Sequence, residues 1–290
     1  MKTEALSEAL EQLLGVKVSA LRSVSGGDIN HALCATLSDG TKVFVKTQPL
    51  AARDFFACEA DGLAWLAASR ALRIPRVLAA TNALEGVPAF LALEWIEPGR
   101  PAPDHDEQLG RGLAALHRSG ATNFGYVRDN FLATLPQANA PLETWPAFYV
   151  RLRLQPLATQ AMKRGLLDAS VLHELERVFE RIDALCGPSE PPSRLHGDLW
   201  GGNAIVDEAG APVLVDPAVY GGSREIDLAM MRLFGGFGPR VFDAYAEAFP
   251  LADGHEERVP LYQLYPLLAH VCLFGESYNA AVKRALSALR

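Results

Sequence analysis

Three polar residues in a short stretch of the chain have the types and spacing needed for acid–base and metal chemistry. Asp198 follows His196 by two positions, Asn203 is the fifth residue after Asp198, and a further acid, Asp216, comes later. A positioned carboxylate can accept the proton of a reacting hydroxyl group. Carboxylate and amide oxygens are ligands that suit Mg2+, usually together with phosphate oxygens. The stretch therefore predicts a site that activates a hydroxyl group beside a metal-bound phosphate.

A hairpin is expected to position these residues. Residues 204–206 and 212–215 are apolar and flank residues 207–210, which have turn chemistry. The turn lies midway between Asn203 and Asp216, so a symmetric hairpin places these two residues side by side, with Cβ atoms roughly 5 Å apart. That separation suits two ligands of one Mg2+ ion, and it leaves Asp198 to act as the base.

The order of these residues matches a kinase catalytic loop, in which His-x-Asp-x-x-x-x-Asn is followed by a metal-binding Asp. In that template Asp198 accepts the proton of the substrate hydroxyl, while Asn203 and Asp216 hold the metal. A polar loop that caps a hairpin is the alternative, because Gly, Asn and Asp are common turn residues. Four residue types at the template spacing favour a kinase that uses ATP and Mg2+.

The composition is typical of a soluble globular protein and argues against several other classes. The 290 residues are 49% hydrophobic and 21% charged, with a formal net charge of −7. An acidic chain argues against nucleic acid or an anionic membrane as the main partner. The sequence shows neither a signal peptide nor an apolar run long enough to span a bilayer. The scattered cysteines, without zinc spacing, predict reduced thiols in a cytoplasmic protein: Cys34, Cys58, Cys186 and Cys272.

A glycine-containing turn between two strands is the first candidate for phosphate contact. An amphipathic helix is predicted at residues 4–14, and residues 23–37 have the pattern of strand, turn and strand. Gly26 and Gly27 would let backbone N–H groups approach a phosphate closely. A simple hairpin is the alternative, because Gly-Gly pairs are common in hairpin turns.

Lys46 ends the apolar strand predicted at residues 42–46. This position matches the V-x-x-K pattern of kinases, in which the lysine contacts the α- and β-phosphates and pairs with a glutamate on the next helix. The next predicted helix, residues 52–69, carries Glu59 near its packed edge. A solvated strand-end lysine is the alternative for Lys46 alone, but a glutamate at a packed edge needs a cation. The context therefore favours a Lys46–Glu59 pair.

The strand predicted at residues 89–96 runs into Pro98 and Gly99, which indicates a crossover between two lobes. The expected lobes are residues 1–96, with a nucleotide-binding sheet and one main helix, and residues 97–290, with the catalytic loop and the substrate cleft. The backbone of Glu94, Trp95 and Ile96 is expected to meet the adenine edge. The expected fold is α+β, with a small antiparallel-sheet lobe and a larger, mainly helical lobe.

The second lobe carries further candidate residues. Asp227 opens a helix, where an acid favours the helix dipole, and it also has the position to brace the catalytic loop, with His196 as structural support. Gly197 stands where protein kinases have arginine, and few residues separate Asp216 from Asp227, so no activation segment is expected. His270 is a candidate residue of the substrate cleft. Other helices are predicted at residues 107–118, 145–160, 168–185, 240–249 and 261–289.

These motifs resemble the fructosamine kinase (ketosamine-3-kinase) family, a relative of aminoglycoside phosphotransferases and choline kinases. Residues 196–203 are similar to the family's HGDLWxGN, and residues 216–230 are similar to DPAxYxGxRExDLAM. Further similarity lies in residues 124–137 and 274–278, so that the resemblance covers almost the whole chain.

The resemblance implies a two-lobed protein-kinase-like fold and transfer of the γ-phosphoryl group of ATP to the 3-hydroxyl of a ketoamine, free or protein-bound. The phosphorylated ketoamine would then break down spontaneously, so the biological role would be deglycation. It implies Asp198 as proton acceptor, Asn203 and Asp216 as Mg2+ ligands, and Lys46 with Glu59 as the phosphate-positioning pair. Residues 94–96 would form the adenine hinge. Trp200 would offer its indole face to the sugar, or pack in the interior instead.

Two other functions stay open at this point. One is a kinase for another amine-bearing alcohol, such as an aminoglycoside or choline, and the other is an inactive nucleotide-binding regulator. Lys46, Asp198, Asn203 and Asp216 together argue against the regulator, because a protein that only binds nucleotide needs no base. A monomer or weak homodimer is expected. Some family members carry a redox-active cysteine in the glycine-rich loop, and residues 23–30 contain none.

Overall fold

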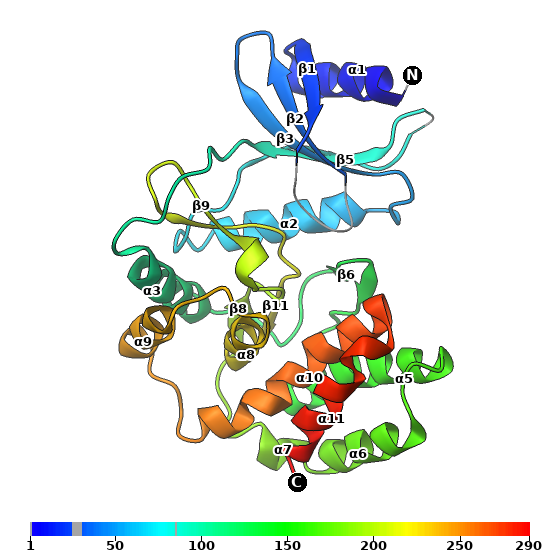
Figure 1. The fold of residues 1–290 in the computed structure, drawn as a ribbon, viewed down its shortest axis with the longest axis vertical. Coiled ribbons are helices and arrows are strands. Elements are labelled where there is room, and N and C mark those ends of the chain that lie inside the picture. The colour runs from blue at the N-terminus through cyan, green and yellow to red at the C-terminus, as the bar shows by residue number, and fades with distance from the viewer. Residues whose placement is uncertain (1, 25–30, 85) are drawn as a thin grey trace. The chain divides into compact units, whose positions relative to one another are not determined.

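The structure is a computed structural model that describes residues 2–24, 31–84 and 86–290 (Figure 1). The chain divides into two compact units. Unit 1 comprises Met1–His105 and Ile205–Pro217, and unit 2 comprises Asp106–Ala204 and Ala218–Arg290. The sequence had suggested a single boundary after Ile96, whereas here the chain returns to unit 1 for residues 205–217.

Unit 1 is built on a five-stranded antiparallel sheet with strand order β1-β2-β3-β5-β4. Side chains alternate across this sheet. Val43 and Val45 on β3 are fully buried in a cluster with Leu6 and Leu10 of the first helix. The elements are α1 (Lys2–Leu14), β1 (Val18–Ser23), β2 (His31–Leu37), β3 (Lys42–Gln48), α2 (Phe55–Ala67), β4 (Val77–Thr81) and β5 (Ala89–Glu94).

The hairpin of β9 (Ala204–Val206) and β10 (Pro212–Leu214) has the strands predicted from the sequence, with β10 ending one residue early. Backbone hydrogen bonds hold it within unit 1. Gly99 N donates to Val206 O at 3.1 Å, and Leu214 N donates to Arg73 O at 3.1 Å.

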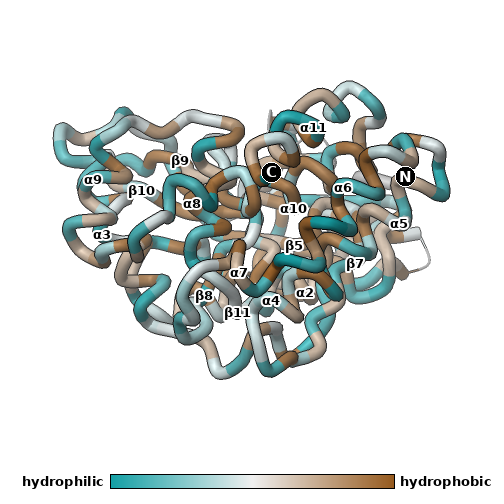
Figure 2. Tube along the Cα trace, turned by 90° about the horizontal axis from the view of Figure 1, so that it is seen from below, coloured by the Kyte–Doolittle hydropathy of each residue, from teal (hydrophilic) through white to brown (hydrophobic). Residues whose placement is uncertain are grey.

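Unit 2 is mainly helical, and Leu261, Leu264 and Leu268 of α10 (His255–Phe274) are fully buried in its hydrophobic core. Figure 2 shows hydrophobic residues, in brown, along α10. The helices of unit 2 are α3 (His105–Arg118), α4 (Trp145–Phe148), η1 (Tyr149–Leu154), α5 (Gln155–Lys163), α6 (Ala169–Glu180), α7 (Ile182–Leu185), η2 (Gly201–Asn203), α8 (Glu225–Phe234), α9 (Pro239–Ala248), α10 (His255–Phe274), η3 (Glu276–Tyr278) and α11 (Asn279–Ser287). Two short antiparallel pairs, absent from the sequence prediction, complete it: β6 (Asn130–Leu132) with β7 (Leu135–Gln137), and β8 (Ser193–Leu195) with β11 (Tyr220–Gly222). The predicted α+β class is confirmed.

Three helices that were predicted as continuous are interrupted. The segment at 168–185 breaks at Arg181, between α6 and α7. The segment at 145–160 contains a π-helix, η1, between α4 and α5. Pro156 has no N–H to donate to the carbonyl of Leu152 four residues earlier, so the regular helical bond is missing there. The segment at 261–289 breaks at Gly275, whose φ of +87° ends α10 before α11 begins. Figure 1 shows α11, in red, returning alongside α10.

A close contact between α3 and α9 gives a test of the packing in unit 2. A Cβ atom at Gly110 would lie 2.2 Å from the carbonyl oxygen of Val241. Helix propensity alone predicts that Gly110→Ala stabilises the protein by about 1 kcal/mol. Because the obstacle is backbone, we expect the opposite sign, a loss of about 3 kcal/mol in the free energy of unfolding, measured by urea denaturation. The control is Ala115→Gly at an exposed position of the same helix, which should lower the free energy of unfolding by about 1 kcal/mol.

Candidate functional site

In unit 1, one ammonium group is shared by two carboxylates. Lys46, on β3, is buried, and its Nζ lies 2.7 Å from Oε1 of Glu59 on α2. The same Nζ donates to Oδ1 of Asp216, which follows β10. Strand, helix and hairpin therefore each contribute one member of this cluster, and the predicted Lys46–Glu59 contact is present in the structure.

Electrostatics in this cluster favour the charged lysine. Burial alone would lower the pKa of Lys46, but the charges of Asp216 and Glu59 outweigh burial and raise it. Burial raises the pKa of Glu59, and the negative charge of Asp216 adds to this effect against the opposing attraction of Lys46. The two carboxylates share one cation, and together they keep the lysine charged despite its burial.

The backbone at Asp216 is strained. Its φ is +57°, in the left-handed region that non-glycine residues seldom adopt, and the next residue is Pro217, which further restricts the residue before it. Strain of this kind costs on the order of 1–3 kcal/mol and concentrates at functional sites. The conformation directs the Asp216 carboxylate to Lys46.

An arginine that the sequence analysis missed anchors the hairpin carrying Asp216. Arg73 Nη1 lies 2.6 Å from Oδ2 of the buried Asp207 in the hairpin turn. Glu208, at 3.4 Å, and Glu94, at 3.6 Å, lie near the same guanidinium group. Asp207 also accepts bonds from the backbone of its own turn. No sequence motif marks Arg73, because its partners in the hairpin, Asp207 and Glu208, lie more than a hundred residues away.

The residues predicted to contact adenine lie at the end of β5, where part of their hydrogen-bonding capacity is already used. The backbone N–H of Glu94 donates to the carbonyl of Arg76 at 2.9 Å. The indole of Trp95 donates to Glu97 at 2.9 Å and lies 5.6 Å from Lys42 Nζ. The Glu94 N–H is therefore already bonded, and the contact of the Glu94–Ile96 backbone with adenine stays a prediction. Gly26 and Gly27 lie outside the described residues.

In unit 2, a buried carboxylate holds the backbone of the catalytic loop. Asp227, near the start of α8, accepts bonds from the backbone N–H of His196 at 2.8 Å and of Gly197 at 2.9 Å. Burial would raise the pKa of Asp227, but the neighbouring His117 and these bonds keep it below its usual value. His117, near the end of α3, lies 3.2 Å from Asp227 and 2.8 Å from the hydroxyl of Tyr245.

The conformation and packing at position 197 explain why a glycine lies between His196 and Asp198. Its φ is +82°, and a Cβ atom there would lie 2.1 Å from the carbonyl oxygen of Ala218. The neighbouring His196 accepts a backbone bond from Ala218 at 2.9 Å. A side chain at position 197 would separate the two segments, so the glycine is required by packing as well as by backbone conformation.

Asp198 and Asn203 are joined within the loop. The side-chain amide of Asn203 donates to the backbone oxygen of Asp198 at 2.8 Å and to its carboxylate Oδ2 at 3.1 Å. These bonds orient the carbonyl oxygen of the Asn203 amide away from Asp198. The five-residue spacing in the sequence therefore lets the Asn203 side chain turn back and bond Asp198, which closes the loop.

Two residues predicted to contact substrate lie on neighbouring segments of unit 2. Trp200 is 40% exposed, so its indole is accessible to solvent. The next residue, Gly201, packs against Gly236, just beyond the end of α8. The ring of Phe234, the last residue of α8, contacts that of His270 in a tilted arrangement, with centroids 4.4 Å apart. Burial lowers the pKa of His270, and its Nδ1 lies 2.8 Å from the carbonyl of Pro266, which requires the proton on Nδ1.

The predicted site residues thus form two clusters, one in each unit. Unit 1 brings together Lys46, Glu59 and Asp216. In unit 2, Asp227 holds the loop in which Asn203 bonds Asp198. Across residues 2–24, 31–84 and 86–290, no group of three or more His, Cys, Asp or Glu side chains could hold a metal ion. The Asn203 amide oxygen and the Asp216 carboxylate are hard oxygen donors, the type that fits Mg2+ when phosphate supplies the remaining ligands.

The bracing by Asp227 predicts a pH-dependent loss of stability. Asp227→Asn should lower the free energy of unfolding by about 3 kcal/mol at pH 6, because a buried hydrogen-bonded charge is lost. The pKa of Asp227 is lower in the folded than in the unfolded protein. Its contribution is therefore complete above the unfolded value, about pH 4, and is lost as the pH falls through the folded value.

Urea denaturation at several pH values measures this effect. The difference between wild type and Asp227→Asn should shrink as the pH falls below about 4. The exposed Asp243 on α9 provides the control, since Asp243→Asn should change stability by less than about 0.5 kcal/mol. A difference for Asp227→Asn that is constant across this pH range would contradict the assigned ionisation.

Comparisons with known proteins agree with the sequence motifs. The family model described as fructosamine kinase matches residues 2–290. A protein named probable ketoamine kinase from Enterococcus faecium is 40% identical over 264 residues, which cover 91% of this chain and 92% of that protein. The structure of a candidate fructosamine-3-kinase from Thermobifida fusca has a TM-score of 0.90 and 39% identity, with 98% of each chain covered.

A more distant structure shows the wider fold. An aminoglycoside phosphotransferase aligns with a TM-score of 0.65 over 98% of this chain and 96% of its own, at only 15% identity, which is similarity of fold alone. The two-lobed protein-kinase-like fold expected from the motifs is confirmed by these structural similarities. The chain belongs to the fructosamine kinase family.

Proposed function

We propose that the protein transfers the γ-phosphoryl group of ATP to the 3-hydroxyl of a ketoamine. The observation that carries this proposal is membership of the fructosamine kinase family over residues 2–290, in a chain that keeps Asp198 in a braced catalytic loop. Relatives named probable ketoamine kinase support the substrate class. The acceptor sugar would be a fructosamine, ribulosamine or erythrulosamine on a lysine or a free amine.

The roles of the residues follow from their chemistry. Asp198 would accept the hydroxyl proton as the sugar oxygen attacks the γ-phosphorus and the bond to ADP breaks. Lys46, held by Glu59, would bind the α- and β-phosphates, and Gly26 and Gly27 would contact phosphate through their backbone. Catalysis of this kind depends mainly on positioning and charge stabilisation.

Asn203 and Asp216 would hold Mg2+. The ion, when bound, neutralises the charge that develops on the phosphate oxygens. The bonds from the Asn203 amide to Asp198 support this assignment, because they keep the amide oxygen on the side opposite the base. The bond from Lys46 to Asp216 holds that carboxylate beside the lysine proposed to bind phosphate.

The acceptor side of the site would use aromatic groups. The exposed indole of Trp200 offers an apolar face to a sugar ring. His270, neutral and ringed by Phe234, Phe274 and Tyr278, could accept a hydrogen bond through Nε2. Both residues lie in unit 2, as does Asp198.

The biological role would be deglycation, because a phosphorylated ketoamine breaks down and releases the amine. A cytoplasmic protein, monomeric or weakly dimeric, fits this role. Its four cysteines are buried, and Cys34, Cys186 and Cys272 are free thiols, which suits a reducing compartment. In the described ranges, every helix is too short or too polar to cross a bilayer.

Substitution of the base tests the mechanism. Asp198→Asn keeps the size of the side chain but cannot accept the proton, so turnover should fall about a thousandfold while ATP binding persists. Turnover is measured as ADP release with Mg2+ on a ribulosamine, a fructosamine, kanamycin and choline, and ATP binding by calorimetry. Full activity of the variant would overturn the assigned base. Turnover of kanamycin or choline alone would overturn the ketoamine assignment.

Substitution of Trp200 tests the acceptor site separately. Trp200→Ala should raise the KM for the ketoamine about tenfold through loss of the stacking surface, with the KM for ATP unchanged. Trp200→Phe should recover part of the loss, since an aromatic face remains. An unchanged ketoamine KM in Trp200→Ala would limit the role of Trp200 to packing over Gly202, which its indole contacts.

A further inference from the structure

A fully buried arginine in unit 2 has a role that the proposed reaction does not use. Arg153 lies in the π-helix η1 and is 0% exposed. Its guanidinium group lies 3.9 Å from the ring centre of Tyr220 and 4.5 Å from that of Phe148. Tyr220 pairs with Leu195, directly before the catalytic loop. The charge is therefore buried against the pair of strands β8 and β11, of which β8 precedes the catalytic loop.

The hydrogen bonds of Arg153 account for only part of its donors. Nη1 donates to the carbonyls of Ala138 at 2.7 Å and Leu152 at 3.0 Å, and Nη2 donates to Oδ1 of Asn139 at 2.6 Å. The Leu152 carbonyl accepts this bond because Pro156 has no N–H to occupy it. Arginine has five N–H groups, and Nε is without a partner among the described residues. Two N–H groups, Nε–H among them, thus remain unused.

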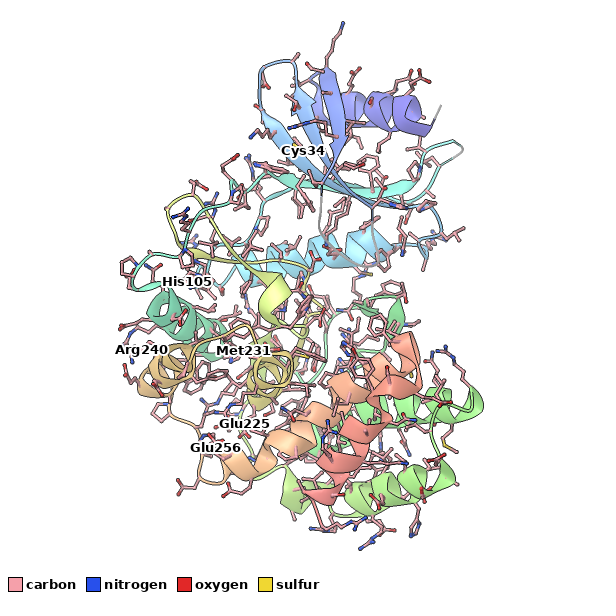
Figure 3. The ribbon with its side chains drawn as sticks, in the orientation of Figure 1. Cys34, His105, Glu225, Met231, Arg240 and Glu256 are labelled. Carbon is pink, nitrogen blue, oxygen red and sulfur yellow. The ribbon has the colours of Figure 1, made fainter. Side chains whose placement is uncertain are left out.

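Two other buried arginines of unit 2 each form an ion pair with a carboxylate. Arg224 forms two bonds to the carboxylate of Glu190, at 2.7 and 2.8 Å. Arg258 is paired in the same way with Glu225, labelled in Figure 3. No carboxylate within the described ranges lies at ion-pairing distance from Arg153, whose acceptors are all neutral. A buried charge is costly unless an opposite charge or a full set of bonds compensates it.

A small cavity lies next to Arg153. Its volume is about 20 Å3, and Arg153, Gln137 and Tyr265 supply its polar lining. The remaining lining is apolar and includes Leu132, Leu135 and Leu157. A space of this size holds a water molecule or a single halide ion. The aromatic rings of Phe148, Tyr220 and Tyr265 stabilise the charge in part. The unused donors and the lack of a carboxylate partner among the described residues favour an anion over a neutral water.

We propose that the cavity at Arg153 binds a monovalent anion of halide size, of the chloride class. The anion accepts from the unused N–H groups of the guanidinium and supplies the negative charge that Glu190 and Glu225 supply to the other two arginines. The site is independent of the proposed phosphoryl transfer, since it requires neither ATP nor the ketoamine.

Occupancy of this site should stabilise a polar network that reaches the segment after Asp216. Asn139, which accepts from Arg153, donates to Asn130 at 2.8 Å. Asn130 donates to the carbonyl of Val219 at 2.8 Å, and Gln137 donates to that of Ala218 at 3.2 Å. An anion that holds Arg153 in place therefore also holds Asn139, the acceptor at one end of this network.

Bromide identifies the site directly. Crystals of the wild-type protein grown or soaked in sodium bromide should show an anomalous scattering peak within hydrogen-bonding distance of Arg153. A peak without anomalous signal at that position is water and overturns the proposal, as does an empty cavity. Bromide found only at exposed arginines, such as Arg240 in Figure 3, is an adventitious ion only and also overturns it.

Thermal unfolding supplies a second, independent readout. Replacing sodium gluconate with sodium chloride at constant ionic strength should raise the Tm of the full chain by about 3 °C at ten times the dissociation constant. Arg153→Met should abolish this difference, and the surface control Arg240→Met should retain it. Equal Tm values of the wild type in the two salts overturn the proposal. If Arg153→Met does not fold, Arg153→Lys, which lacks Nε–H, replaces it and should lose most of the difference.

Discussion

The geometry of the catalytic loop depends on one buried charge, the carboxylate of Asp227. Burial of a charge is tolerated only when hydrogen bonds replace the lost water. Asp227 meets this condition with the backbone N–H groups of His196 and Gly197 and with the ring of His117. Each carboxylate oxygen holds one of two successive amides, so the peptide planes on either side of His196 cannot rotate independently. The direction of Asp198 follows from these constraints.

Unit 1 uses a different balance of charge. Here a single cation, Lys46, serves two acids, Glu59 and Asp216. A strained backbone at Asp216 is maintained because the hairpin around it is anchored by Arg73 through Asp207. The strain is local, whereas the anchoring bonds are spread over the hairpin and the segment before β4. The hairpin therefore stays with the sheet of unit 1, although the residues on both sides of it in the chain belong to unit 2.

Local sequence signals predicted the features that depend on neighbours in the chain. The Lys46–Glu59 contact, the β9–β10 hairpin and most helix positions follow from periodicity, turn residues and spacing. Features set by distant contacts could not be found in this way. Periodicity continues through residues 149–154, so it does not show the π-helix that places Arg153 inside unit 2. Likewise His117 has the pattern of a core residue, and only the fold brings it to Asp227.

The segment from residue 128 to 139 shows why a sequence motif without an evident chemical role can still serve the site. Its amides, Asn130, Gln137 and Asn139, are buried and bond one another as well as the carbonyls of Ala218 and Val219. An apolar core would bury more hydrophobic surface, but it would not specify the direction of a peptide group. Amide side chains do so, because each bond requires a particular donor and acceptor. The backbone that follows Asp216 is thereby held by directional bonds, and the neutral character of these amides leaves the Arg153 charge without a carboxylate partner among the described residues.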